Sequence, residues 1–322
     1  MASITLPIHG LLPINKPLGL ISKDVSRKLI RKFGKLHIGH VGTLDPAADG
    51  VLPVLLGRAT RLQDHLLELP KSYTLEITFG YETDTLDSEG KIVKELPADF
   101  VTEDMVKNAI PLFLGPIEQI PPIYSAVKLR GKPLYEYARS GKEDQVQTEK
   151  LIRSVTIYAL DFLEFSGKKA VLSVTCSKGT YVRTLVKDIA TSIGTCGTLT
   201  RLTRTVAAGV NLLNTVDLDQ IVDDANAALA DFVIPMEKIK FGFPKWKTPD
   251  ERFVARLMNG LETVIDRQVF FEGLGKDQEE FVPGSLSTQV LLVNENDFVF
   301  AIGAVKAGDG DRVIVNMKRG LR

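Results

Sequence analysis

The sequence predicts an α+β fold, with one large domain followed by a small β-rich domain. Its 322 residues are long for one domain, and a hydrophobic fraction of 44% supports a sizeable core. Alternating strand patterns and amphipathic helical stripes are interspersed over the first 240 residues. From about residue 247, short strand-like runs separated by turn residues indicate a small barrel or sandwich. We therefore expect domains at 1–240 and 247–322.

The N-terminal elements follow from local patterns. An apolar run at 10–14 predicts a strand, and Ser22 is placed to cap a helix over 23–33. A buried segment at 51–56 is followed by a helix at about 58–68. In residues 72–81, apolar and polar side chains alternate, which predicts a half-buried strand with Tyr73 on its apolar face.

Residues 39–46, which read GHVGTLDP, predict an irregular loop. Gly39 and Gly42 would break a helix and weaken a strand, while Pro46 favours an extended conformation at Asp45. The loop therefore presents one carboxylate with few sequence neighbours that could neutralise it. Two interpretations follow from these residues: Asp45 is a turn-forming or capping aspartate, or it is a catalytic nucleophile.

The middle of the chain contains further elements. Thr102 is expected to cap a helix that ends near Gly115, and the prolines and basic residues of 120–150 indicate an excursion from the core. Strands are predicted at 152–165 and 170–177, and a helix starts at about 180, with Arg183 in its first turn. The last expected strands lie at 289–293, 298–305 and 312–316.

The net charge is zero, but the charge is unevenly distributed. Residues 1–80 hold ten Lys or Arg against six Asp or Glu, and residues 205–237 hold six acids and no base. The basic residues of the 23–33 helix form either a solvated face or a phosphate-binding surface. Two cysteines without metal-like spacing, no signal peptide and no apolar stretch of membrane length predict a cytoplasmic protein.

Four stretches resemble, in order, the TruB family of bacterial tRNA pseudouridine synthases, which act on the uridine at position 55 in the TΨC loop. They are residues 15–19 (NKPLG), 37–46 (HIGHVGTLDP) with 50–53 (GVLP), 120–139, and 176–183 (CSKGTYVR). The resemblance covers about residues 9–210. The residues from about 247 are more faintly similar to the PUA RNA-binding module of this family.

The resemblance implies a pseudouridine-synthase fold with a mixed, largely antiparallel central sheet flanked by helices, and an RNA-binding excursion at about 120–150. It implies a monomer that acts on the tRNA TΨC stem-loop without a metal, an organic cofactor or an obligatory protein partner. Asp45 matches the nucleophile, Tyr73 the tyrosine that stacks on the base, Arg183 the arginine that pairs with the nucleophile, and His40 a histidine beside the flipped nucleotide; Lys16, Tyr181 and Leu202 match pocket positions.

Structural interpretations compete with these roles. His40 is otherwise a loop hydrogen-bonding residue, Tyr73 closes an apolar face, and Arg183 is a surface base. Two departures from the family pattern also stand out. Asn15 replaces the more frequent Asp, and Asp49 replaces a Thr; we expect Asp49 to point to solvent.

Isomerisation at a glycosidic bond suits the predicted residues, because it needs a nucleophile, a partner that keeps it charged, and a surface for an extruded base. A non-catalytic RNA-folding module would use the same basic helix and C-terminal domain. The guide-RNA-dependent branch of the superfamily is less favoured, because the GHVGTLDP motif is bacterial in style and there is no long Lys-rich tail.

Overall fold

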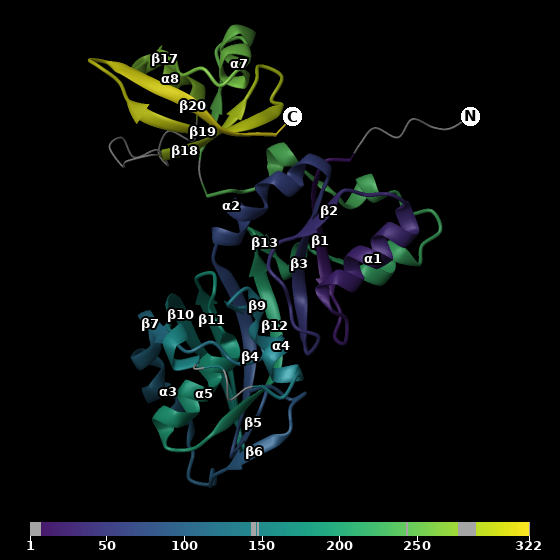
Figure 1. Cartoon of the computed structure of the whole chain (residues 1–322), viewed down its shortest axis with the longest axis vertical. Coiled ribbons are helices and arrows are strands. Elements are labelled where there is room, and N and C mark those ends of the chain that lie inside the picture. Colours follow the sequence, from purple (N-terminus) through teal and green to yellow (C-terminus); the bar gives the residue numbers. More distant parts are fainter. Residues whose placement is uncertain (1–7, 143–145, 147, 243, 276–287, 322) are drawn as a thin grey trace.

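The computed structural model describes residues 8–142, 146, 148–242, 244–275 and 288–321. Within them, a large sheet has the strand order β14-β1-β3-β12-β4-β11-β10-β7, with β2, β13 and β15 paired to it at the side (Figure 1). These strands are β1 (Gly10–Lys16), β2 (Ile38–His40), β3 (Ala48–Leu56), β4 (Lys71–Phe79), β7 (Gly115–Gln119), β10 (Arg153–Ser166), β11 (Lys169–Cys176), β12 (Gly197–Ala207), β13 (Val210–Asn211), β14 (Val216–Asp217) and β15 (Ile234–Pro235).

The large sheet is mixed. β12 lies parallel to β3, and β14 lies parallel to β1, whereas the other neighbours in the strand order are antiparallel. The expected mixed, largely antiparallel sheet is thereby confirmed. Two small hairpins stand apart from it, β5 (Tyr81–Thr83) with β6 (Ile92–Glu95) and β8 (Lys128–Leu129) with β9 (Lys132–Pro133).

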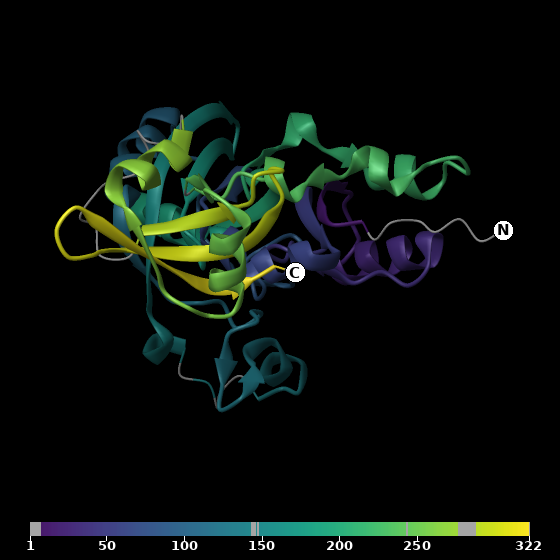
Figure 2. The same cartoon turned by 90° about the horizontal axis from the view of Figure 1, so that it is seen from above.

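Helices cover the sheet at several places. α3 and α5 pack together against β4, β10 and β12, and α1 lies against β2 and α6 (Figure 1). Part of the expected excursion, β8, β9 and α4, projects away from the sheet (Figure 2); its residues 143–145 and 147 lie outside the described residues. The helices are α1 (Ser22–Phe33), α2 (Gln63–Glu68), α3 (Glu103–Ala109), α4 (Leu134–Arg139), α5 (Val182–Ile193), α6 (Leu218–Val222), α7 (Glu251–Met258) and α8 (Arg267–Leu274).

A separate C-terminal sheet confirms the β-rich end of the chain. Its strand order is β16-β18-β19-β20-β17, and it has its own apolar core around the buried Trp246 and Phe270. It packs on the first unit through a shared apolar cluster, and Arg319 donates to the carboxylate of Asp64 at 3.0 Å. Its strands are β16 (Lys245–Lys247), β17 (Thr263–Asp266), β18 (Thr288–Val293), β19 (Val299–Ala307) and β20 (Arg312–Gly320).

Several element boundaries differ from those expected. The loop expected at 39–46 begins only at Val41, because Gly39 and His40 pair with β3 as part of β2. The helix expected at 58–68 is a 3-10 turn (Gly57–Leu62) followed by α2. Thr102 does cap α3, since its hydroxyl accepts from the Met105 amide. That helix ends at Ala109 and continues only as a 3-10 turn that contains Pro111.

The prediction that Ser22 caps α1 is wrong. Ser22 is the first helical residue, and its side chain makes no capping bond. Its hydroxyl instead donates to the Leu44 carbonyl at 3.1 Å and accepts from the Leu44 amide at 2.9 Å. The same hydroxyl chemistry that suits a cap therefore ties the start of α1 to the loop that carries Asp45.

Gly50 in β3 lies where the chain is packed too closely to accept a side chain. Its φ is +99°, and a Cβ there would meet the Arg204 carbonyl oxygen at 2.3 Å. We expect Gly50→Ala to lower the free energy of unfolding by roughly 2–4 kcal/mol, because both the conformation and the space exclude a side chain. The matched control is Gly34→Ala, where φ is +83° but nothing lies within 4 Å. Equal losses of stability for the two variants in urea unfolding would contradict this account.

Candidate active site

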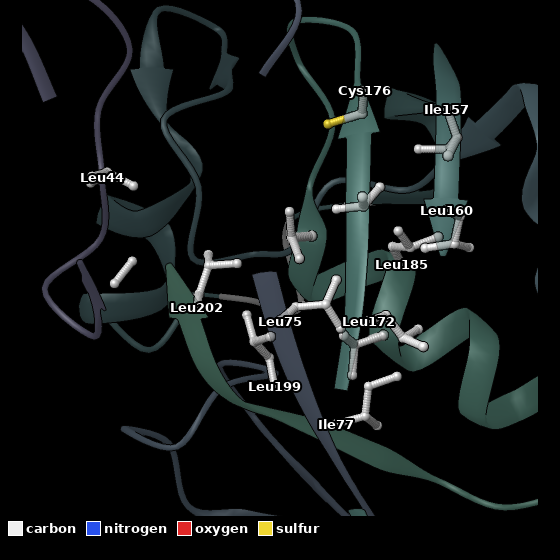
Figure 3. Close-up of a cluster of buried hydrophobic side chains, with 14 of the residues drawn as sticks. Leu44, Leu75, Ile77, Ile157, Leu160, Leu172, Cys176, Leu185, Leu199 and Leu202 are labelled. Atoms are coloured by element: carbon white, nitrogen blue, oxygen red, sulfur yellow. The ribbon is translucent and has the colours of Figure 1, made fainter. Parts of the chain in front are cut away.

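The loop that carries Asp45 connects β2 to β3 and is held in the core by the residue before it. Leu44 is only 3% exposed and belongs to the same buried cluster as Leu75 and Leu202 (Figure 3). The bonds from Ser22 fix the Leu44 backbone as well. The Asp45 side chain, in contrast, is 45% exposed. The aspartate is therefore accessible although its backbone is anchored.

A buried arginine supports the loop from the sheet side. Arg204 on β12 donates to the carbonyls of Val51 at 2.7 Å and Gly42 at 3.0 Å, with a longer contact to Thr43 at 3.4 Å. Burial lowers the pKa of Arg204, which still leaves a guanidinium charged at neutral pH. Sequence reasoning missed this residue. One feature of the sequence could have indicated its role. Arg204 follows Leu202 by two positions in a strand, so the two side chains lie on the same face.

Arg183, at the start of α5, reaches the carboxylate from another direction. Its Nη2 atom lies 3.0 Å from Oδ2 of Asp45, and the side chain is only 10% exposed. The guanidinium also donates to the carbonyls of Thr85 and Tyr124, both at 3.0 Å. The interpretation of Arg183 as a surface base is therefore wrong, because its side chain is inside the site.

A second carboxylate, Asp87, faces the same arginine. Its Oδ2 atom is 3.5 Å from Nη1 of Arg183, and it is buried. The Thr85 hydroxyl and the Glu89 amide both donate to the Asp87 carboxylate, which orients it. Sequence reasoning missed Asp87, because it lies in a turn-like stretch after β5 whose composition indicates only a hairpin connection.

A small hollow, partly open to solvent, lies at this cluster. Its lining combines charged side chains with apolar ones, which suits a ligand that has both polar and apolar groups. Of the residues that sequence analysis singled out, Asp45, Arg183 and Leu202 line it. The full lining is Asp45, Ala47, Ala48, Asp87, Ser88, Arg183, Leu199, Thr200, Arg201 and Leu202.

Tyr73 and Lys16 lie close to this hollow but do not line it. Tyr73 on β4 interacts with the Arg204 guanidinium, and burial raises the pKa of its phenol, so it stays neutral. Lys16 is fully buried, and its ammonium donates to the carbonyls of Pro17 and Leu20. Burial lowers the pKa of Lys16, while the charges of nearby acids, Asp49 first and then Asp45, oppose this effect.

His40 and Tyr181 lie at the margins of the site. His40 is half-buried on β2, and burial, then the charges of Arg204 and Lys23, lower its pKa, which favours a neutral imidazole. Tyr181 directly precedes α5. Its amide and carbonyl are both bound by the Gln119 side chain, which fixes the entry to that helix.

The expectation that Asp49 points to solvent is wrong. Asp49 is half-buried, and no described residue donates a hydrogen bond to its buried Oδ1 atom. Its charge acts on Lys16, where it opposes the lowering of the pKa by burial. The other departure from the family pattern, Asn15, donates to Asp217 at 2.8 Å and so joins β1 to β14.

Within the described part of the chain, no group of three or more His, Cys, Asp or Glu side chains could hold a metal ion. None of the described helices is both long and apolar enough to cross a membrane.

Solved structures share this fold. The chain superimposes with a TM-score of 0.70 on a structure titled "Crystal Structure of a Cbf5-Nop10-Gar1 Complex", over 97% of this chain and 85% of that one, at 22% identity. It also superimposes with a TM-score of 0.69 on a structure titled "Structure of H/ACA RNP bound to a substrate RNA containing 2'-deoxyuridine", with the same coverage and identity. At this identity the likeness concerns the fold, and it confirms the expected pseudouridine-synthase architecture.

Curated relatives are considerably more similar in sequence. The "tRNA pseudouridine synthase B" of Dehalococcoides mccartyi (strain CBDB1) is 40% identical over 261 residues, which cover 81% of this chain and 85% of the relative. The protein of the same name from Clostridium kluyveri is 38% identical over 83% of this chain and 93% of its own length. A family model described as "TruB family pseudouridylate synthase (N terminal domain)" matches residues 30–182. With the Asp45 loop and the described fold, these matches show that the chain belongs to the TruB family of pseudouridylate synthases.

Proposed function

We propose that this protein converts the uridine at position 55 in the TΨC loop of tRNA to pseudouridine, with Asp45 as the nucleophile. The observation that carries the proposal is the 3.0 Å ion pair between Asp45 and Arg183 at the edge of a small hollow. The names of the bacterial relatives support tRNA as the substrate. A carboxylate held by a guanidinium can remain charged while RNA excludes water from the site.

The reaction needs no oxidant, reductant or net hydrolysis. The carboxylate of Asp45 adds to the target nucleotide, and the bond between ribose C1' and base N1 breaks. The base then rotates, and C5 forms the new bond to C1'. The hydrogen on C5 leaves as a proton, N1 takes up a proton in place of its lost bond to C1', and the bond from Asp45 to the nucleotide is released, so the enzyme is regenerated.

The uridine must leave its folded loop to reach the site, at a cost of a few kcal/mol. We propose that Tyr73 offers an aromatic face to the base and that His40 fills part of the vacated space. A neutral imidazole at His40 and a neutral phenol at Tyr73 suit these roles, because neither adds a charge to a stacking surface. Leu202, in the wall of the hollow, supplies an apolar contact, and we place Lys16 and Tyr181 in supporting positions around the pocket.

We further propose that the protein acts as a cytoplasmic monomer on bare tRNA, without a guide RNA or protein subunits. Relatives near 40% identity carry the tRNA synthase name, whereas the neighbours known from ribonucleoprotein complexes are 22% identical. Activity on an isolated TΨC stem-loop with no other component supports this proposal, and an absolute requirement for a second macromolecule contradicts it.

Asp45→Asn tests the nucleophile. We expect tritium release from a stem-loop with 5-tritiated uridine to fall by roughly 10⁴-fold or more, because an amide cannot add to the nucleotide and leave again. Binding of the stem-loop should persist. Asp49→Asn is the matched control, since it neutralises the second acid of the same stretch. A wild-type rate in Asp45→Asn disproves the assignment, and an equal loss in both variants shows that the effect is not specific to the nucleophile.

Asp87→Asn tests the buried carboxylate behind Arg183. We expect kcat to fall by roughly 10-fold to 100-fold with little change in KM, because the Arg183 guanidinium loses the second carboxylate that helps to hold it against Asp45. The control is Asp84→Asn, an exposed acid in the same hairpin that accepts from the Lys91 amide at 2.9 Å. A wild-type kcat in Asp87→Asn, or a matching loss in Asp84→Asn, would show that Asp87 does not position Arg183.

A further inference from the structure

Helix α1 carries basic residues on two different faces. At about 100° per residue, Lys23, Arg27 and Arg31 share one face of the helix, and Lys28 and Lys32 share another. The first three are exposed, whereas Lys28 and Lys32 are half-buried. The basic run of the sequence is therefore two surfaces, and they need not have the same role.

The Lys28 and Lys32 face is covered by the acidic segment that follows β14. Nζ of Lys28 lies 3.9 Å from Oδ1 of Asp219, and Lys32 donates to the carbonyl of Asp224 at 2.7 Å. The segment is anchored there because Leu218 and Ile221 of α6 are buried in the main core. Figures 1 and 2 both show α6 and its neighbours alongside α1. This face is therefore occupied by another part of the protein.

The face that carries Lys23, Arg27 and Arg31 remains open. Within the described residues, Lys23 and Arg31 form no ion pair, and Arg27 pairs only with Asp24 of its own helix, at 2.8 Å. Such an exposed pair at a spacing of three residues contributes little and is easily exchanged for another anion. Four residues of helix rise by about 6 Å, so the three cations form a row whose spacing resembles that of successive phosphates along an RNA strand.

The row begins at the active site. The Ser22 hydroxyl at the start of α1 binds the Leu44 backbone, next to Asp45. The Gly19 amide, just before the helix, donates to the Pro46 carbonyl at 2.9 Å. Lys23 is also close enough to His40 for its charge to act on the imidazole. An RNA strand that places one nucleotide at Asp45 would therefore have its flanking backbone beside Lys23.

We propose that Lys23, Arg27 and Arg31, which we call the α1 row, bind consecutive phosphates of the RNA strand that flanks the target nucleotide. Lys28 and Lys32 make no RNA contact and serve to hold the acidic segment. The proposal rests on RNA being the substrate and names the surface that carries its backbone. Phosphate contacts of this kind position the nucleic acid without reading its sequence.

The test compares two charge-matched variants of the full chain, Lys23→Gln/Arg31→Gln and Lys28→Gln/Lys32→Gln. The dissociation constant of a fluorescent TΨC stem-loop is measured from 50 to 200 mM salt, and circular dichroism checks folding. Loss of the first pair should make the slope of log K against log salt shallower by roughly 1.5. Loss of the second pair should leave the slope unchanged. If the second double variant is unstable, Lys28→Gln alone serves as the control.

Equal slopes for the wild type and Lys23→Gln/Arg31→Gln overturn the proposal, as does a shallower slope that is confined to the Lys28 and Lys32 pair. The reaction is monitored separately by tritium release at saturating stem-loop. Tritium release by the wild type with an unchanged slope in the first variant rejects the α1 row and leaves the proposed function standing. A shallower slope with no tritium release by the wild type supports the row as an RNA surface and rejects the proposed reaction.

Discussion

The ion pair between Asp45 and Arg183 is the contact on which the site depends. Its two partners differ in environment, because the carboxylate is 45% exposed and the guanidinium only 10%. Removing a cation from water is costly unless several acceptors replace the lost hydration. Asp87 and the carbonyls of Thr85 and Tyr124 provide those acceptors. The guanidinium is consequently held in one orientation, and the direction from which it meets Asp45 is fixed before any substrate binds.

The loop itself needs a second set of restraints, since an ion pair fixes a side chain and not a backbone. Leu44 is packed in the core, and Ser22 and Arg204 bind the backbone groups around it. Arg204 has no carboxylate partner among the described ion pairs; its guanidinium binds carbonyl oxygens of the loop and of β3 and also the Tyr73 phenol. A cation used in this way leaves the carboxylate of Asp45 free to pair with Arg183 and to react.

Sequence reasoning was strongest where local patterns determine structure. The mixed α+β architecture and the C-terminal β-rich unit followed from periodicity and from the family resemblance. Asp87 and Arg204 were missed, because their partners lie far along the chain and only the folded sheet brings them together. Ser22 was assigned to its own helix because a hydroxyl before an apolar stripe suits a cap, and nothing local indicates a bond to Leu44. Asp49 was expected in solvent, but it lies in β3, where both faces are largely apolar and the sequence does not distinguish the inward face from the outer one.

A net charge of zero is also consistent with RNA binding, because of where the acidic and basic residues lie in the structure. Part of the acidity of residues 205–237 lies against α1, where Asp219 and the Asp224 backbone meet Lys28 and Lys32. These acids lower the net charge of the whole chain, but they do not neutralise the exposed side of α1 that carries Lys23, Arg27 and Arg31. Association with a polyanion depends on the local potential within about a Debye length, so a chain with no net charge can still present a basic row. The same segment contributes Leu218 and Ile221 to the core, which links the position of α1, and hence the exposed row, to the packing of the domain.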